Sequence, residues 1–137
     1  MNYVELLKKA DLKATPQRLS VLKTLDKHKH PTIDELFEEV KETYPSISLA
    51  TVYKNLNVLI DNKLAIEIQA PNQKSKYDVF ETPHVHVVCK NCGHVEDIMA
   101  DDAKLLEYKD YLQNYILEPI DHISVTVCTK NCKFCAN

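Results

Sequence analysis

The sequence of 137 residues contains one glycine, no tryptophan and no apolar run of the ~18 residues that a membrane helix needs. Residues 1–5 carry an early acid and a broken apolar pattern, unlike a secretion signal. No internal repeat or low-complexity segment is present. The hydrophobic content of 45% excludes a disordered chain. The lack of a membrane helix and of a secretion signal predicts a cytoplasmic protein with no membrane partner.

The negative charge is confined to one part of the chain. Residues 1–78 hold 12 Lys/Arg against 11 Asp/Glu, whereas residues 79–137 hold five against nine. The first thirty residues are the most basic, with seven basic and three acidic side chains. A basic leading segment on a protein of net charge −3 is compatible with phosphate contacts through one surface only.

Residues 1–80 have the pattern of four helices followed by a hairpin. Helix starts are predicted at Thr15, where Pro16 takes the first helical position, at Thr32, which opens a capping box, and at Ser48. Residues 64–68 and 76–80 alternate as two strands around a turn. This order predicts a winged-helix DNA-binding domain. The alternative is a plain helical domain.

The fourth predicted helix has an unusual polar face. A small residue, an aromatic hydroxyl, a cation and an amide recur at helical spacing in Ala50, Tyr53, Lys54 and Asn57. Such a mixture can meet base edges and phosphates in a DNA major groove. The alternative is a merely solvated face.

Residues 84–137 form a second predicted domain, after a linker at about residues 81–83. Strands are expected near residues 85–87, 95–99 and 123–127, with a helix that begins at Asp101 or Asp102. About 55 residues bury little core alone, so we expect this α/β domain to depend on a metal and on a second copy of itself. The fold class is therefore α+β, with a C-terminal dimerisation domain.

Cysteines at both ends of this domain have the spacing of zinc ligands. Cys89 and Cys92 form one pair, and Cys132 joins either Cys135 or Cys128 in the second. Five cysteines in a reducing compartment are expected to bind metal and not to form disulfides, with one left over. A redox dithiol is the alternative for the first pair.

A second set of donors combines nitrogen and oxygen. His84 and His86 share one face of a predicted strand, and Asp97 lies on the next strand. Asp78 and His30 lie in the preceding domain. This set suits Fe(II), Mn(II) or Zn(II). The three remaining histidines are interpreted as structural: His28, His94 and His122.

Several motifs together resemble the ferric-uptake-regulator family of bacterial metalloregulators over the whole chain. They are Thr15-Pro16-Gln17-Arg18, His30-Pro31-Thr32, Ser48-Leu49-Ala50-Thr51-Val52-Tyr53-Lys54-Asn55-Leu56, His84-Val85-His86-Val87-Val88-Cys89 and Cys89-Lys90-Asn91-Cys92-Gly93. The resemblance implies a homodimeric winged-helix repressor of operator DNA, not an enzyme, with a structural zinc on four cysteines and a regulatory metal between the two domains. No small organic cofactor is implied.

Within this family, the peroxide-stress regulators look most similar. Their regulatory Fe(II) or Mn(II) site is matched by His30, Asp78, His84, His86 and Asp97. The resemblance implies that peroxide reacts with the iron-loaded site and that His30 or His84 is oxidised, which releases DNA; manganese would sense peroxide slowly. The expected DNA contacts are Lys13, Arg18, Ala50, Thr51, Tyr53, Lys54 and Asn57.

One departure from the family pattern and two alternative functions remain. The last strand has Val125-Thr126-Val127-Cys128 where the family commonly has Tyr-Gly-x-Cys. An iron- or zinc-responsive uptake repressor is the alternative within the family, although those repressors usually carry a His-His-Asp-His run where this chain has Pro83-His84-Val85-His86. A zinc hydrolase or deaminase is a distant alternative, because the sequence contains no His-Glu-x-x-His motif. The sequence names neither the operator nor the physiological metal.

Overall fold

The computed structural model describes residues 2–80 and 83–135, and the chain divides into two compact units. The first unit comprises Met1–Ile68 and Lys74–Glu81, and the second comprises Gln69–Gln73 and Thr82–Asn137. Two positions of the predicted linker, residues 81 and 82, lie outside the described residues. In the part of the chain that the structure describes, no helix is long and apolar enough to cross a membrane.

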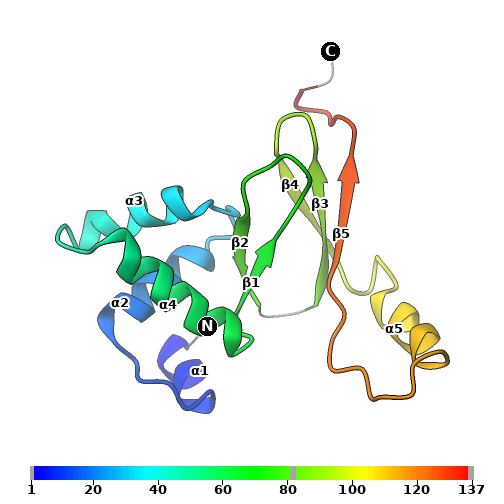
Figure 1. The fold of residues 1–137 in the computed structure, drawn as a ribbon, viewed down its shortest axis with the longest axis horizontal. Helices are drawn as coiled ribbons and strands as arrows, with labels where there is room; N and C mark the ends of the chain where they lie inside the picture. The colour runs from blue at the N-terminus through cyan, green and yellow to red at the C-terminus, as the bar shows by residue number, and fades with distance from the viewer. Residues whose placement is uncertain (1, 81–82, 136–137) are drawn as a thin grey trace. The chain divides into compact units, whose positions relative to one another are not determined.

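Four helices begin the first unit (Figure 1). They are α1 (Tyr3–Lys9), α2 (Pro16–Leu25), α3 (Ile33–Thr43) and α4 (Leu49–Asp61). Each has a polar N-cap residue whose side chain accepts a hydrogen bond from a backbone N–H of the first turn: Asn2, Thr15, Thr32 and Ser48. The predicted starts at Thr15, Thr32 and Ser48 are therefore correct.

A hairpin completes this unit. Strands β1 (Ala65–Ile68) and β2 (Lys76–Val79) pair antiparallel. The Tyr77 N–H donates to the carbonyl oxygen of Pro31 at 2.9 Å, which joins β2 to the segment before α3. Four helices and this hairpin form a winged helix, in agreement with the predicted fold class.

Leucine and valine side chains from all four helices form the core of the first unit. The largest of them are fully buried: Leu7, Leu22, Leu25, Leu36, Leu56 and Leu59. Burial of one such side chain stabilises a fold by about 1.5–3 kcal/mol. The helices are thus held by their apolar faces, which leaves the opposite face of α4 exposed.

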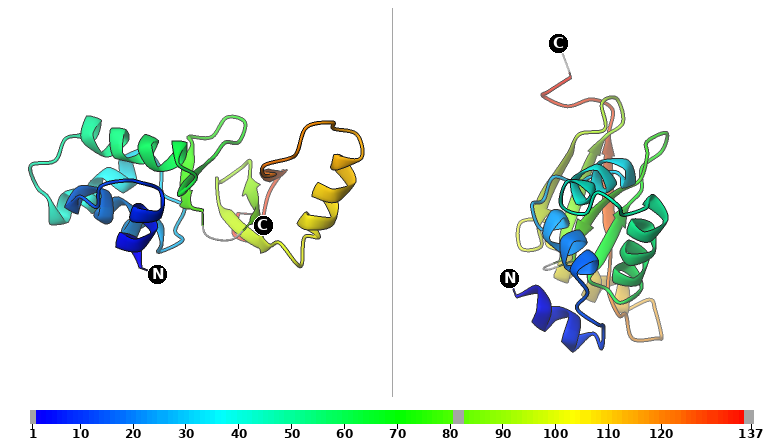
Figure 2. Two further views of the ribbon diagram at one scale, coloured as in Figure 1. Left: turned by 90° about the horizontal axis from the view of Figure 1, so that it is seen from below. Right: turned by 90° about the vertical axis from the view of Figure 1, so that its left-hand side faces the viewer.

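The second unit contains a three-stranded sheet with the order β4-β3-β5 (Figure 1), which Figure 2 shows from two further sides. Strand β3 (His84–Cys89) pairs antiparallel with β4 (Val95–Met99) and parallel with β5 (Val125–Thr129). Helix α5 (Leu105–Gln113) lies between β4 and β5 in the chain. A parallel pair needs such a crossover connection.

The predicted start of this last helix is wrong by three or four residues. Asp101 and Asp102 lie in a turn, and α5 begins at Leu105 after Lys104, which has a left-handed φ of 53° and no side-chain cap. Backbone hydrogen bonds, including Leu105 N–H to the Ala100 carbonyl at 3.0 Å, already close this turn. The aspartates are therefore not needed as caps.

Candidate metal centres

Four thiols gather in the second unit. The Sγ atoms of Cys89 and Cys135 lie 3.6 Å apart, those of Cys92 and Cys132 lie 3.5 Å apart, and those of Cys132 and Cys135 lie 3.7 Å apart. A disulfide would bring two sulfurs to about 2.05 Å. Four sulfurs at about 2.3 Å from one tetrahedral zinc ion are about 3.8 Å from each other. The thiol spacing fits a four-sulfur zinc site.

Two short turns place these sulfurs. Cys89 ends β3, and the following turn contains Gly93, whose φ of 79° suits glycine and whose N–H donates to the Cys89 carbonyl at 2.8 Å. Beyond β5, a second turn is closed by the Cys135 N–H and the Cys132 carbonyl at 3.2 Å. Each turn supplies two thiols, in agreement with the spacing of the sequence.

The surroundings of Cys89 favour the deprotonated thiolate, which is the form of cysteine that binds a metal. The backbone N–H groups of Cys92 and Asn91 and the thiols of Cys135 and Cys92 lower the pKa of the Cys89 thiol to about 6. Zinc ligation requires deprotonated thiols, so the lowered pKa of Cys89 assists binding, whereas burial and the thiols of Cys132, Cys89 and Cys135 raise the pKa of Cys92 to about 11.

Cys128 lies outside this group. It is exposed on β5, opposite Val88 of β3. The sequence spacing leaves Cys128 and Cys135 as alternatives for the fourth thiol, and the structure brings Cys135 to the other three. Which thiols ligate zinc remains a prediction, which these positions support for Cys135.

Three nitrogen and oxygen donors also gather in the second unit. The Nε2 atoms of His84 and His86 lie 2.8 Å apart, and Asp97 Oδ1 lies 3.6 Å from the first and 3.5 Å from the second. The antiparallel register places His86 opposite Asp97. Two imidazole nitrogens at about 2.1 Å from one ion and at right angles are about 3.0 Å apart. The three donors can therefore share one ion.

Two further donors lie in the first unit. His30 Nε2 lies 3.6 Å from Asp78 Oδ2, and both side chains are buried, with exposed fractions of 8% and 0%. Asp78 extends from β2, and its Oδ1 atom accepts a hydrogen bond from the Val79 N–H at 2.8 Å. A buried carboxylate of this kind requires compensating donors or a cation.

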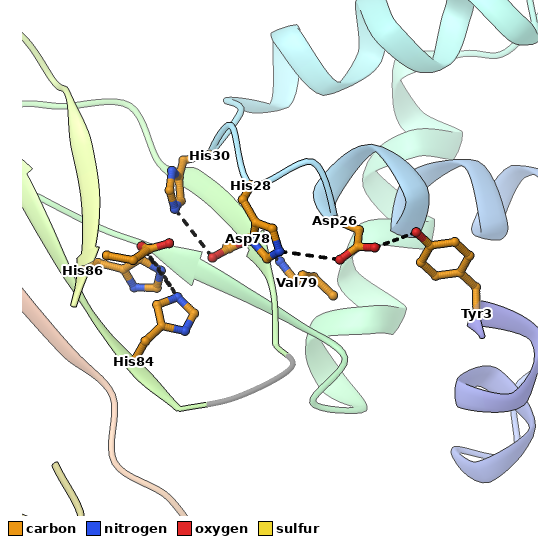
Figure 3. Close-up of polar contacts among 9 residues, drawn as sticks. Tyr3, Asp26, His28, His30, Asp78, Val79, His84 and His86 are labelled. Carbon is orange, nitrogen blue, oxygen red and sulfur yellow. Dashed lines mark hydrogen bonds and ion pairs between the residues drawn. The ribbon is translucent and has the colours of Figure 1, made fainter. Parts of the chain in front are cut away.

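His28, interpreted from the sequence as a structural histidine, also contacts Asp78. Its Nδ1 atom lies 3.2 Å from Asp78 Oδ1, and its Nε2 atom lies 3.5 Å from Asp26 Oδ1. Asp26 in turn accepts a 2.6 Å hydrogen bond from the Tyr3 hydroxyl (Figure 3). The spacing His28-Lys29-His30 was the available signal, since it repeats the i, i+2 pattern of His84 and His86.

The predicted DNA-contacting residues are accessible. All five that belong to α4 are exposed: Ala50, Thr51, Tyr53, Lys54 and Asn57. Lys13 is exposed, and the half-buried Arg18 donates from Nη1 to the Lys13 carbonyl at 2.7 Å. This bond orients one guanidinium nitrogen toward the protein backbone.

Comparisons with known proteins agree on one family. The model of the ferric uptake regulator family matches residues 9–123. A peroxide-responsive repressor, PerR, of Staphylococcus epidermidis is 36% identical over 92 residues, which are 66% of this chain and 61% of that relative. The matched region therefore covers less than two thirds of the relative's length.

Solved structures extend the similarity to nearly the whole chain. A peroxide stress regulator from Campylobacter jejuni has 54% identity and a TM-score of 0.85, over 98% of this chain and 100% of the other. The Vibrio cholerae ferric uptake regulator has 25% identity and a TM-score of 0.73, over 96% and 100% of the two chains.

Proposed function

Because this chain belongs to the ferric uptake regulator family, we propose that it is a metal-dependent transcriptional repressor that binds DNA and responds to peroxide. The observation that carries this proposal is a donor set of three histidines and two aspartates, in a chain 54% identical to a peroxide stress regulator. Family members are regulators, so catalysis of a metabolic reaction is not part of the proposal.

The regulatory ion is held by donors from both units. His30 and Asp78 come from the first unit, and His84, His86 and Asp97 come from the second. The distances within each unit, 3.6 Å for His30 to Asp78 and 2.8 Å between the two other imidazoles, support their use as ligands. Nitrogen and carboxylate donors suit Fe(II) and Mn(II).

Shared ligation explains how a small ion controls DNA binding. When His30 ligates together with His84 and His86, the two units are held in one relative orientation. Each 1.4 kcal/mol by which binding favours that orientation changes the ratio of closed to open protein about tenfold. The affinity for DNA thus rises as a larger fraction of the protein has a metal ion bound to these donors.

The thiol group and the exposed apolar surface of the second unit support a homodimer stabilised by structural zinc. Large apolar side chains are exposed on α5, on the segment that follows it and on two strands. They are Ile98, Met99, Leu106, Tyr108, Tyr111, Tyr115, Leu117 and Val127. An apolar surface of this extent is typical of an interface, and a second copy of this unit would cover it.

DNA is read by the exposed face of α4. Tyr53, Lys54 and Asn57 are placed for base edges and phosphates in the major groove, and Lys13 and Arg18 for phosphates. Two such helices in a dimer would meet half-sites about one helical turn apart.

Peroxide sensing needs a redox-active ion and an oxidisable ligand. A ferrous ion held by these residues would activate peroxide, so that one peroxide oxygen is transferred to an imidazole and the other leaves as water. His30 and His84 are the side chains that we expect to gain oxygen, and an imidazole that is oxidised no longer holds the two units together. The repressor then leaves its operator.

One experiment tests this function. The full chain, with its zinc, is loaded with Fe(II) or with Mn(II), and operator binding and intact mass are measured before and after peroxide treatment. We expect the iron form to lose DNA binding while His30 or His84 gains an oxygen atom, and the manganese form to keep binding.

Two results would contradict the proposal. If DNA is released while no histidine gains oxygen, the oxidation mechanism is wrong. If peroxide affects neither form while metal occupancy controls binding, the chain is a metal-responsive repressor, the alternative within the family.

A further inference from the structure

A chain of polar contacts runs through the first unit, from the metal-ligand candidate Asp78 to α1. Asp78 Oδ1 lies 3.2 Å from His28 Nδ1, the other nitrogen of His28 lies 3.5 Å from Asp26 Oδ1, and Asp26 Oδ2 accepts the 2.6 Å hydrogen bond from Tyr3 (Figure 3). These residues come from α1, from the end of α2, from the following turn and from β2. Three segments that are distant in the sequence are thus connected by side chains: α1, the turn after α2, and β2.

The two oxygens of Asp78 have different surroundings. Oδ1 accepts the Val79 N–H at 2.8 Å and faces His28, whereas Oδ2 faces Nε2 of His30 at 3.6 Å. Contacts on one oxygen fix the plane of the carboxylate and direct the other oxygen toward the histidine ligand. Outer partners of this kind orient metal-ligating carboxylates in proteins.

The backbone of the turn is bent to make this contact. His28 and His30 both have left-handed φ angles, 55° and 49°. A residue other than glycine in this region costs about 1–3 kcal/mol and persists only where the surroundings hold it. The left-handed bends bring both imidazoles to Asp78, so the turn is built around this carboxylate.

We propose that His28 is a positioning residue for Asp78, and that Asp26 and Tyr3 extend this link to α1, so that metal binding at Asp78 stabilises the N-terminal helix. This inference rests on the proposed function, in which Asp78 is a metal ligand. Through this link, metal binding would change the stability of α1 within the first unit, in addition to any effect on the orientation of the two units.

The length of α1 makes it responsive to such a link. The helix has seven residues, and a helix shorter than about 12 residues is marginal without tertiary contacts. Leu7 anchors it in the core, and the Tyr3 hydroxyl ties its first turn to Asp26 at the end of α2. Lys13 lies between α1 and α2, and Arg18 lies in the first turn of α2, so the order of α1 affects the segment proposed to contact phosphates.

Replacement of His28 by glycine tests the positioning role. Glycine adopts a φ of 55° freely, so His28→Gly removes the side chain and preserves the bend. We expect Mn(II) affinity, measured by calorimetry on the zinc-loaded full chain, to fall about tenfold, the usual effect of losing an outer partner. The thermal midpoint of the Mn-free variant should not fall. Unchanged Mn(II) affinity would overturn the positioning role.

Replacement of Tyr3 by phenylalanine tests the link to α1. Hydrogen exchange of the α1 amides is measured with and without Mn(II) in the wild type and in Tyr3→Phe. We expect Mn(II) to slow exchange several-fold in the wild type. The variant should bind Mn(II) with the same affinity and show little of this protection. Equal protection in both proteins, or none in the wild type, would overturn the link.

A third variant separates this inference from the function on which it rests. His84→Ala removes a proposed direct ligand in the other unit. If His84→Ala weakens Mn(II) binding and His28→Gly does not, only the positioning role fails. If His84→Ala binds Mn(II) as the wild type does, the proposed ligand set fails, and the positioning role fails with it.

Discussion

The two groups of metal donors in this chain differ in where their members come from. All four clustered thiols belong to the second unit, and three of their separations are 3.5–3.7 Å. The histidine and aspartate donors are divided, with two in the first unit and three in the second. Both groups have suitable chemistry for a divalent ion.

This difference separates stability from regulation. A site that is complete within one unit stabilises that unit whenever it is filled, and has no effect on the other unit's orientation. A site that needs donors from two units can favour one arrangement of them over another. In the proposed function, this division of donors, more than their chemical type, makes the histidine group the regulatory one.

The largest expected effect comes from loss of a clustered thiol. Cys132→Ser removes one of the four sulfurs, and structural zinc contributes about 10–16 kcal/mol of apparent binding energy in small zinc-dependent domains. We expect loss of zinc and of cooperative unfolding in the second unit, measured by metal analysis and thermal denaturation. Cys128→Ser is the matched control, because that exposed thiol lies outside the cluster and should keep full zinc.

The opposite result would contradict the assignment of the four clustered thiols as the zinc ligands. If Cys128→Ser loses zinc and Cys135→Ser does not, the fourth ligand is Cys128, and the second turn is not the one that holds the ion.

A smaller but more specific effect is expected for the histidine group. His84→Ala should abolish metal-dependent operator binding and leave zinc content and the dimer unchanged. Loss of an outer partner already weakens metal binding about 10–100-fold, so loss of a direct ligand should exceed this range. Operator binding is titrated with Mn(II). His122→Ala is the control, since that exposed imidazole contacts Asp121 and belongs to neither donor group. Loss of zinc in His84→Ala would show that the two groups are not independent.

The smallest effect is expected from loss of the ion pair between Lys133 and Glu96. Lys133 Nζ lies 3.2 Å from Glu96 Oε1, and the hydrogen bond and charge of Lys133 lower the pKa of the Glu96 carboxyl. Because the folded pKa is lowered, this contact stabilises the fold above the ordinary pKa of Glu96 and is lost as pH falls through the lowered one. In Lys133→Ala, the pKa measured by NMR titration should rise toward 4.5, with zinc content unchanged. Zinc loss in this variant would mean that this exposed pair supports the thiol turn.

Local patterns predicted most of the fold correctly. Three helix starts follow from capping residues that act on their own first turn, as in Thr32 with Glu35. The failure at α5 has the same basis: Asp101 and Asp102 are good caps, but backbone hydrogen bonds of the turn decide where the helix begins. Capping propensity cannot foresee a turn that is closed by the backbone.

The histidines show a different limit. Period-two spacing placed His84 and His86 on one strand face, which the 2.8 Å contact confirms. His28 could not be assigned in this way, because its contacts depend on two left-handed residues and on Asp78, fifty positions away. Likewise, Cys135 and Cys128 have equally plausible spacing to Cys132, and only the fold of the last turn distinguishes them.

The parallel pairing of β3 and β5 makes the thiol group a reversible crosslink of the chain. Cys89 lies opposite Thr129 in this pairing, so both turns follow strands that end at the same end of the sheet, although Cys92 and Cys132 are 40 residues apart. Closing a loop of this length restricts the unfolded chain by about 4 kcal/mol in the entropy model for disulfides. A crosslink through thiolates and an ion gives the same restriction without oxidation of sulfur, and it opens by chelation or acid and not by electron transfer. A protein proposed to meet peroxide thus gains a loop closure that does not depend on a redox reaction.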